Sequence, residues 1–185
     1  MIQSILDWCS EVVSESDVVS RDILEVGSYN VNGSFRPYIE SLNPSTYTGV
    51  DQLSGPDVDV IGKAEHLVNV YGPASFDVVI STEMLEHCEH WHDAVWNMME
   101  VTKPGGLHII STRSPGFPWH PYPEDWWRFS LDDIRAIWSS WDILDARDDP
   151  EMPGVFIKAR KRHDWDSLLD YLRLTSMTVY RQPQL

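Results

Sequence analysis

Short runs of apolar residues recur along this 185-residue chain and alternate with stretches in which apolar residues return every three or four positions. The runs predict strands, and the second pattern predicts amphipathic helices. Two of the runs, 76–80 and 107–110, place apolar residues at successive positions, as expected for strands that helices cover on both faces. The predicted strands span residues 22–26, 47–50, 58–61, 76–80, 107–110, 141–145 and 154–159.

The order of these elements predicts an α/β fold: a Rossmann-like doubly wound sheet of seven strands, mostly parallel, with helices on both faces. The last two strands follow one another without room for a helix, so we expect an antiparallel hairpin at the C-terminal edge of the sheet. Helices are predicted at residues 2–15, 82–103 and 164–174. The first is amphipathic and is expected to cover one edge of the sheet.

The chain is long enough for one domain with a substantial core, which we place at residues 1–185. Its parts are an N-terminal helix (1–19), a core (20–160), and a C-terminal helix and tail (161–185). The first and last helices also allow a homodimer. The second predicted helix ends at residues 103–106, Lys-Pro-Gly-Gly, which form a breaker before the next strand.

Charge and cysteine content narrow the class of partner. The formal net charge is −15, which argues against nucleic acid or an anionic membrane as a partner. Cys9 and Cys88 are far apart and form no Cys-x-x-Cys motif, so neither a disulfide scaffold nor a structural zinc site is expected. The sequence has no apolar run of about 18 residues and no basic N-terminal signal, so we expect a cytoplasmic protein.

The most informative segment is residues 23–33, in which an apolar strand leads into a glycine-bearing loop, followed at Asp51 by a second strand that ends on an acid. Such a loop lets backbone N–H groups approach a charged ligand, and the acid can bind ribose hydroxyls. Tyr29 stands where a dinucleotide fingerprint needs its second glycine, which argues against NAD and an oxidoreductase. A zwitterion such as S-adenosylmethionine needs instead an acid near its ammonium group and donors for its carboxylate. Glu25 and the backbone of residues 28–30 supply both.

Four segments, taken in their order along the chain, resemble those of the class I S-adenosylmethionine-dependent methyltransferases, in particular small bacterial and phage-type methyltransferase-domain proteins. They are the Glu25-x-Gly27 loop, residues 47–51 (Tyr-Thr-Gly-Val-Asp), residues 76–87 (Phe-Asp-Val-Val-Ile-Ser-Thr-Glu-Met-Leu-Glu-His) and residues 103–106. The resemblance covers residues 20–160 and implies S-adenosylmethionine as cofactor and S-adenosylhomocysteine as product. The implied cofactor-binding residues are Glu25, Gly27, Ser28, Tyr29, Asn30, Gly33, Asp51, Gln52, Ala64, Glu65, Ser81, Thr82 and Glu83.

Within that set, the resemblance implies that the residues around Gly27 surround the methionine moiety, that Asp51 holds the ribose, and that Ala64 and Glu65 flank the adenine. Two positions depart from the family. Lys63 stands where an acid often binds the adenine amine, so Glu65 or a backbone group must replace it. Tyr29 narrows the loop and either stacks on the cofactor or crowds it.

Methyl transfer from a sulfonium is an in-line displacement, so the protein mainly aligns the reactants and adds a base where the acceptor must lose a proton. His87 and His120 are the candidate catalytic bases, because an ordinary histidine pKa is about 6.5. A purely structural hydrogen bond is the alternative for His87. The run 87–92 (His-Cys-Glu-His-Trp-His) also invites a metal site, but it lacks the spacing of a recognised zinc motif, and we predict no metal there.

Residues 113–130 form a segment rich in proline and aromatic residues that follows the fifth strand, where open α/β sheets place their ligand crevice. The family contains a similar His-x-Tyr-Pro-x-Asp-x-Trp-Arg-Phe stretch, often in proteins assigned small polar acceptors. The candidate substrate-binding residues are Arg113, Tyr122, Trp126 and Arg128. The alternative is structural: the aromatic residues pin the loop to the core, and Arg128 pairs with Asp125 or Glu124. Ser130 is interpreted as a helix N-cap, and Trp138 and Trp141 as core residues.

Together these features predict an enzyme that transfers a methyl group to a small polar acceptor. The alternative function is a non-catalytic S-adenosylmethionine-binding subunit that regulates or assists a partner.

Overall fold

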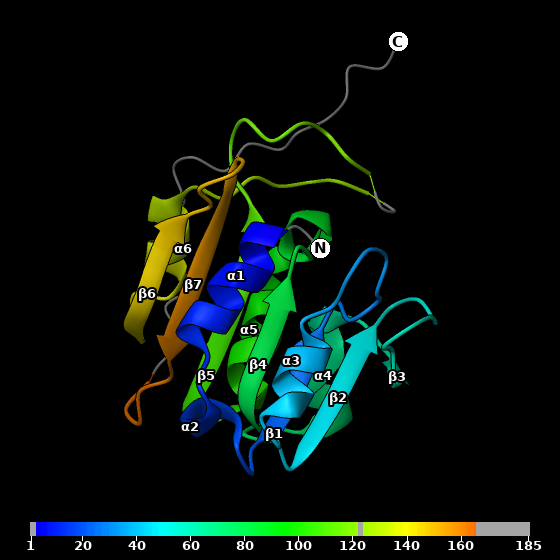
Figure 1. Ribbon diagram of the computed structural model, residues 1–185, viewed down its shortest axis with the longest axis vertical. Coiled ribbons are helices and arrows are strands. Elements are labelled where there is room, and N and C mark those ends of the chain that lie inside the picture. Colours follow the sequence, from blue (N-terminus) through cyan, green and yellow to red (C-terminus); the bar gives the residue numbers. More distant parts are fainter. Residues whose placement is uncertain (1–2, 122–123, 166–185) are drawn as a thin grey trace.

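The computed structural model describes residues 3–121 and 124–165. Seven strands form one sheet in the order β3-β2-β1-β4-β5-β7-β6 (Figure 1). The strands are β1 Asp22–Val26, β2 Thr46–Asp51, β3 Val60–Ile61, β4 Phe76–Thr82, β5 Thr102–Arg113, β6 Asp142–Asp148 and β7 Gly154–Arg160. The pairs among β1 to β5 are parallel, and β7 pairs antiparallel with both β5 and β6. This confirms the predicted mostly parallel sheet with an antiparallel edge hairpin.

The chain reverses its direction across the sheet between β1 and β4. It runs outward from β1 through β2 to β3, and then returns to the other side of β1 to form β4. At such a point the loops that leave two neighbouring strands diverge, which opens a crevice beyond their carboxyl ends. The functional site described below lies there.

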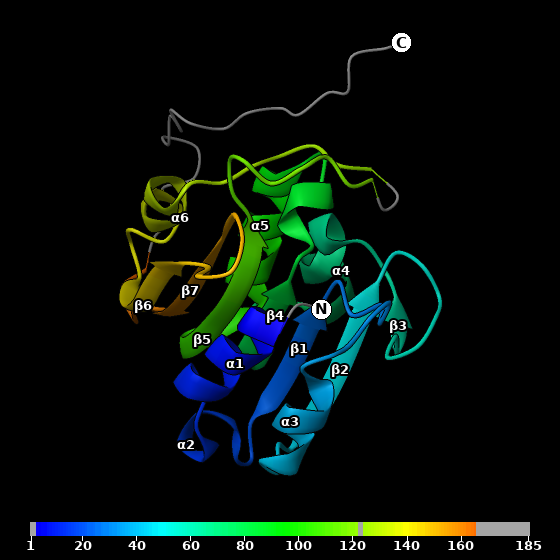
Figure 2. The same cartoon turned by 45° about the horizontal axis from the view of Figure 1, so that its top comes forward.

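Helices cover both faces of the sheet (Figure 2). They are α1 Gln3–Val12, α2 Glu15–Val18 and α3 Arg36–Ser41 on one face, and α4 Leu67–Tyr71, α5 Trp91–Val101 and α6 Leu131–Ile137 on the other, with short 3₁₀ turns η1 Ala64–His66 and η2 Leu85–His87. Successive residues of a strand point to opposite faces. Accordingly Val78 and Ile80 of β4 belong to the core beneath α1 and α3, whereas Val79 belongs to the core beneath α5.

The N-terminal helix is shorter than predicted and lies on a face of the sheet rather than along its edge. Instead of one helix over 2–15, the chain forms α1 and then α2, which begins after Ser14 in a capping box with Asp17. Trp8 of α1 stacks on Phe156 of β7, with ring centroids 4.8 Å apart, and its Nε1–H donates to Asp145 of β6 at 2.9 Å. The apolar side of α1 therefore covers this face of the sheet where β5 pairs with β7.

The prediction of a single helix over residues 82–103 is wrong in its limits. β4 continues to Thr82, because Thr82 pairs with Ser111 of β5, and the chain then makes η2 before α5 begins at Trp91. Nor does the segment 103–106 separate helix from strand, since β5 already begins at Thr102, opposite Phe76, with a register irregularity that accommodates it.

The helix predicted over 164–174 falls almost entirely outside the described residues. None of the helices in the described parts of the chain is both long and apolar enough to cross a membrane.

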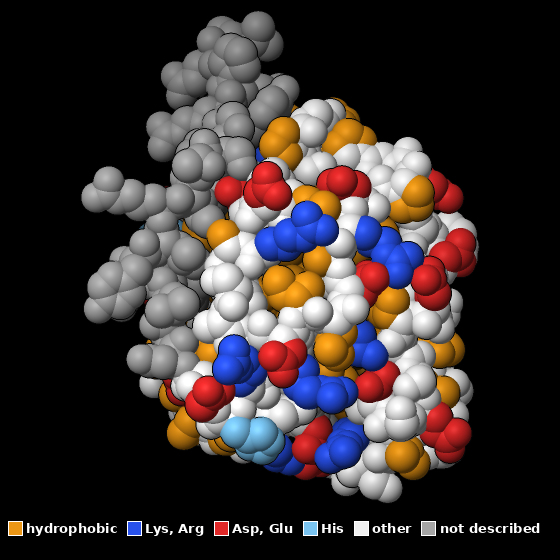
Figure 3. Space-filling model, turned by 90° about the vertical axis from the view of Figure 1, so that its left-hand side faces the viewer, with side chains coloured by type: hydrophobic (Ala, Val, Ile, Leu, Met, Phe, Trp, Pro, Cys, Tyr) orange, Lys and Arg blue, Asp and Glu red, His pale blue; other side chains and the backbone are white. Residues whose placement is uncertain are grey.

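Strand β6 forms one edge of the sheet, and its exposed side carries both basic and acidic side chains. In Figure 3, which faces this side of the molecule, Lys and Arg side chains are interspersed with acidic ones and with small hydrophobic areas. Arg147 of β6 pairs with both Asp145 and Glu11 of α1, while Ile143 and Leu144 are partly exposed. Charged side chains along an edge strand discourage its pairing with another sheet.

We expect Trp8→Ala to lower the free energy of unfolding by about 3 to 5 kcal/mol, because it empties a buried site and removes the hydrogen bond to Asp145. Urea unfolding measures this loss. The matched control is Trp96→Ala on the exposed side of α5, where the change should stay below about 1 kcal/mol. Equal losses in the two variants would contradict the packing role of Trp8.

Candidate functional site

A cavity of about 670 Å³ opens beyond the carboxyl ends of β1, β2 and β4. Most of the residues predicted to bind the cofactor line it: Glu25, Gly27, Ser28, Tyr29, Asn30, Gly33, Asp51, Gln52, Ala64, Glu65, Thr82 and Glu83. Ser81 is the exception, because its fully buried side chain lies within the sheet and not on the cavity wall. The wall continues to His87, Arg113, His120 and Trp126. Most of the predicted cofactor-binding residues, both candidate bases and two of the four candidate substrate-binding residues, Arg113 and Trp126, therefore line one cavity.

The turn after β1 needs a glycine at position 27. Gly27 has a φ of +82°, which side-chain-bearing residues rarely adopt, and a Cβ there would lie 2.6 Å from Cγ of Met84. The N–H groups of Gly27 and Ser28 both donate to the carbonyl of Val50, at 2.9 and 3.2 Å. These bonds hold the loop against the end of β2, so its backbone forms one wall of the cavity.

Glu25 supplies a buried carboxyl group to the same wall. It is 3% exposed, and the Tyr47 hydroxyl donates to its Oε2 at 2.8 Å. Burial raises the pKa of Glu25 from 4.5 to about 7, and the hydrogen bond from Tyr47 offsets only part of that rise. A cation bound in the cavity would stabilise the ionised form.

Asp51 ends β2 as predicted, and both of its oxygens accept backbone hydrogen bonds. The N–H of Tyr29 donates to Oδ2 at 3.2 Å, and the N–H of Leu53 donates to Oδ1 at 2.9 Å. The carboxylate is thereby fixed at the cavity wall with lone pairs left to accept from a ligand. The Tyr29 ring packs against Gly55, where any Cβ would collide with it, so the ring is held to the side of the loop.

Glu83 and Arg113 form an ion pair on the cavity wall. Glu83 directly follows β4 with a φ of +57°, and its carboxylate contacts the guanidinium of Arg113 and accepts from the Ser111 hydroxyl. Burial and the neighbouring Glu86 raise the pKa of Glu83 to about 8, against the opposing effect of Arg113. The Arg113 guanidinium also stacks over the Phe117 ring, 4.1 Å from its centroid.

The segment after β5 is fastened to η2 by its backbone. The N–H groups of Trp126 and Trp127 both donate to the Glu86 carbonyl, at 2.8 and 3.1 Å, and Trp127 Nε1–H donates to the Cys88 carbonyl at 2.7 Å. Phe129 is fully buried in the core. The predicted pinning of the loop is thus confirmed for Trp127 and Phe129, while Trp126 lies on the cavity wall.

Arg128 holds the loop from inside. It is 1% exposed, donates to both oxygens of Asp125 at 2.5 and 2.6 Å, and also donates to the carbonyls of Phe117 and Pro118. The structural alternative, a pair with Asp125, is therefore confirmed, and Arg128 is not on the cavity wall. Tyr122 lies outside the described residues.

The helix cap and the two core tryptophans agree with prediction. Ser130 caps α6 in a capping box with Asp133, and Trp138 and Trp141 are buried beneath the sheet.

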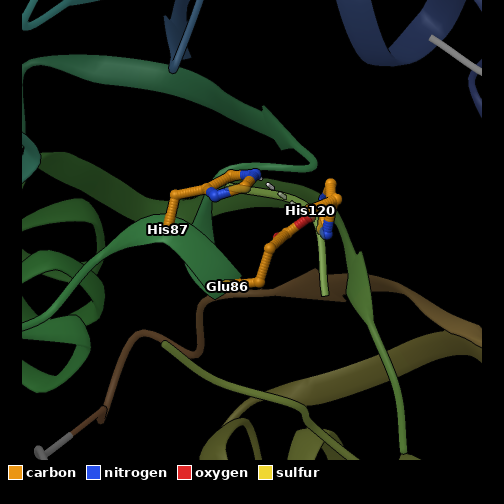
Figure 4. Close-up of side chains that lie close together, drawn as sticks. All are labelled: Glu86, His87 and His120. Carbon is orange, nitrogen blue, oxygen red and sulfur yellow. Dashed lines mark ion pairs between the residues drawn. The ribbon is translucent and has the colours of Figure 1, made fainter. Parts of the chain in front are cut away.

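His87 and His120 come together around Glu86, which the sequence analysis missed (Figure 4). Glu86 is fully buried, and its Oε1 lies 3.9 Å from His87 Nε2 and 3.8 Å from His120 Nε2. Its Oε2 accepts from the Thr112 hydroxyl at 2.8 Å. The sequence did carry a signal for Glu86, because this acid directly precedes the candidate catalytic residue His87. The other histidines of the run 87–92, His90 and His92, are exposed and do not belong to this group, although His90 also lines the cavity.

Comparison with known proteins relates this chain to methyltransferases. Residues 24–110 match a family model described as a methyltransferase domain. A search of the curated proteins finds no matching sequence.

Three solved structures share the fold. A 1,6-didemethyltoxoflavin-N1-methyltransferase from Burkholderia thailandensis, with bound 1,6-didemethyltoxoflavin and S-adenosylhomocysteine, has a TM-score of 0.71 at 15% identity over 86% of this chain and 79% of that one. An S-adenosylmethionine-dependent methyltransferase from Mesorhizobium loti has a TM-score of 0.65 at 15% identity, over 85% of this chain and 98% of that one. The N-methyltransferase NodS from Bradyrhizobium japonicum has a TM-score of 0.65 at 13% identity, over 85% of this chain and 94% of that one. At these identities the likeness is one of fold.

Glu25 should make the stability of the protein depend on pH. Its raised pKa means that the folded state binds the proton more tightly, so its favourable contribution is complete below about pH 4.5 and is lost as the pH rises through about 7. Glu25→Gln cannot ionise. The free energy of unfolding of the variant relative to wild type should therefore rise by about 3 kcal/mol between pH 4.5 and 8, as urea unfolding can measure.

Tyr47→Phe provides the companion variant. Removing the hydroxyl that stabilises the Glu25 carboxylate should move the loss of stability to higher pH. Stability curves of wild type and Glu25→Gln that run parallel from pH 4.5 to 8 would contradict the assignment.

Proposed function

We propose that this chain, which matches a methyltransferase-domain model over residues 24–110, is a class I S-adenosylmethionine-dependent methyltransferase that transfers the methyl group to a small polar acceptor bound beside the cofactor in the same cavity. One observation carries the proposal: residues from the cofactor loop and residues from the segment after β5 line a single cavity of about 670 Å³. A donor and an acceptor bound there would be neighbours.

The proposed cofactor half lies between the loop after β1 and the end of β2. Glu25 offers a carboxylate to the ammonium of the methionine moiety, and the loop backbone offers donors for its carboxylate. Asp51 accepts from the ribose hydroxyls, and Ala64 and Glu65 lie where the adenine would be flanked. Lys63 also lines this end, so any acid for the adenine amine must come from Glu65.

The proposed acceptor half is polar and charged. Arg113, His87 and His120 line it together with Trp126, which gives an apolar surface beside three groups that bind polar atoms. An acceptor with hydroxyl, amine or carboxylate groups would satisfy these side chains. A purely apolar acceptor would leave the polar atoms that these side chains still turn toward the cavity without a ligand partner, at a cost of about 1 to 3 kcal/mol for each buried one.

The proposed reaction needs alignment more than covalent help. A lone pair of the acceptor attacks the methyl carbon, the bond from carbon to sulfur breaks, and its electron pair stays on sulfur to give S-adenosylhomocysteine. A proton leaving the acceptor would pass to the Nε2 atom of His87 or His120, or to water. The alternative of a non-catalytic subunit gains no support from a cavity that extends well beyond the cofactor loop.

Calorimetric titration tests the cofactor half. We expect saturable binding of S-adenosylmethionine and S-adenosylhomocysteine and no binding of NAD, because Tyr29 stands where NAD needs a glycine. Binding of NAD alone would overturn the proposal.

Asp51→Asn should weaken the binding of S-adenosylhomocysteine about 10- to 100-fold, because a charged hydrogen-bond acceptor is worth about 1.5 to 3 kcal/mol. Asp142→Asn makes the same change of charge on the exposed β6 and is the matched control, with unchanged affinity expected. If both variants bind like wild type, Asp51 does not hold the ribose.

A further inference from the structure

Glu86, His87 and His120 converge at the acceptor end of the cavity (Figure 4). One ligand atom from each lies within 4.8 Å of the others, and among the described residues this is the group suited to hold a metal ion. Glu86 and His87 belong to η2, whereas His120 comes from the segment after β5. The loop contacts described above therefore bring together donors that are far apart in the sequence.

The contacts of the two imidazoles indicate which nitrogen faces the centre. His87 Nδ1 contacts the Glu124 carbonyl, which can only accept, so Nδ1 carries the hydrogen and Nε2 has a free lone pair. His120 Nδ1 lies 3.2 Å from the Asp125 carboxylate, so the same tautomer is favoured there. Both Nε2 lone pairs consequently face Glu86 Oε1.

This arrangement is unfavourable for the three groups alone. Glu86 Oε1 is buried and has no hydrogen-bond partner among the residues that the structure describes. A buried acceptor without a partner costs about 1 to 3 kcal/mol, and more when it is charged. The facing lone pairs of the two imidazoles add repulsion. A cation at the centre would turn each of these unfavourable contacts into a favourable one.

We propose that Glu86 Oε1, His87 Nε2 and His120 Nε2 bind a divalent transition-metal ion such as Zn²⁺, Mn²⁺ or Co²⁺. Two imidazole nitrogens and one carboxylate oxygen suit these ions better than Mg²⁺ or Ca²⁺. Bonds of about 2.1 Å place neighbouring ligands roughly 3 to 3.5 Å apart, so the 3.8 and 3.9 Å separations from Glu86 Oε1 need to shorten by about half an ångström. The three ligand atoms lie within 4.8 Å of one another, so metal binding would also bring the two imidazoles closer together.

The surrounding residues complete the pattern of a metal site. Metal-binding histidines usually donate their other N–H to a carbonyl or carboxylate, as His87 does to the Glu124 carbonyl. His120 Nδ1 lies 3.2 Å from the Asp125 carboxylate, which accepts a hydrogen bond from the backbone N–H of His120. Asp125 is in turn held by Arg128. Glu83, in contrast, pairs with Arg113 and is no ligand here. Because both histidines line the cavity, the remaining coordination positions of the ion face the acceptor.

The inference rests on the proposed function for its chemical consequence. A hydroxyl oxygen of the acceptor would bind the ion and release its proton to water, since a bound cation lowers the pKa of such a group. The oxygen then attacks the methyl carbon as the carbon–sulfur bond breaks toward sulfur. With the ion bound, the Nε2 atoms of His87 and His120 are ligands and cannot take the proton, so of the proton routes proposed above only the one to water applies.

The test is titration of chelator-treated protein with Co²⁺, followed by calorimetry and by the visible absorption of the ion. One Co²⁺ per chain is expected, displaceable by Zn²⁺. His87→Ala, His120→Ala and Glu86→Gln should each weaken it at least tenfold. His66→Ala, an exposed histidine of η1, is the matched control and should not.

Binding of S-adenosylhomocysteine by the same variants shows that they are folded and separates the two proposals. Wild-type protein that binds S-adenosylhomocysteine but no Co²⁺, or Co²⁺ equally well in all four variants, overturns the metal site. Protein that binds Co²⁺ through these three residues but no adenosyl compound supports the metal site and overturns the proposed cofactor half.

Discussion

The proposed acceptor half of the cavity depends on one buried residue, Glu86. Its carbonyl accepts the N–H groups of Trp126 and Trp127, which fixes the returning part of the segment after β5. Its carboxylate accepts from Thr112 of β5 and faces His87 and His120. A fully buried acid is costly unless its surroundings are organised around it. Backbone and side chain of the same residue thus hold strand, turn and loop at one point.

The cofactor half depends on local backbone geometry instead. A left-handed residue at Gly27, an acid two positions before it and an acid at the end of the next strand are all properties of short segments. Their placement follows once β1 and β2 pair in parallel, with Glu25 opposite Gly49. The residues that line this part of the cavity could therefore be predicted from the sequence almost one by one. Ser81 departs because its side chain points into the layers of the sheet, whereas Thr82 and Glu83 reach the cavity.

The rest of the site is set by contacts between distant segments, which no local pattern encodes. The run from 82 has helical spacing, yet Thr82 stays in β4 because Ser111 pairs with it. Arg128 looks like a ligand-binding residue in the sequence, yet Asp125 and two carbonyls take up its donors inside the loop. The sequence identified His87 and His120 as chemically active types, but only the folded loop makes them neighbours of the same carboxylate.

The buried acids of the cavity wall would also have an electrostatic effect on the proposed cofactor. S-adenosylmethionine carries a sulfonium cation that methyl transfer removes, so fixed negative charge beside it would stabilise the donor more than the product. Burial moderates this, because it raises the pKa of Glu25 to about 7 and that of Glu83 to about 8. A bound cation favours the ionised form of Glu25, and by linkage ionised Glu25 favours the cation. The negative charge of the wall would therefore be greatest with the cationic donor bound. The ammonium group that S-adenosylhomocysteine keeps would preserve part of this effect after methyl transfer, and the loss of the sulfonium charge would remove the rest.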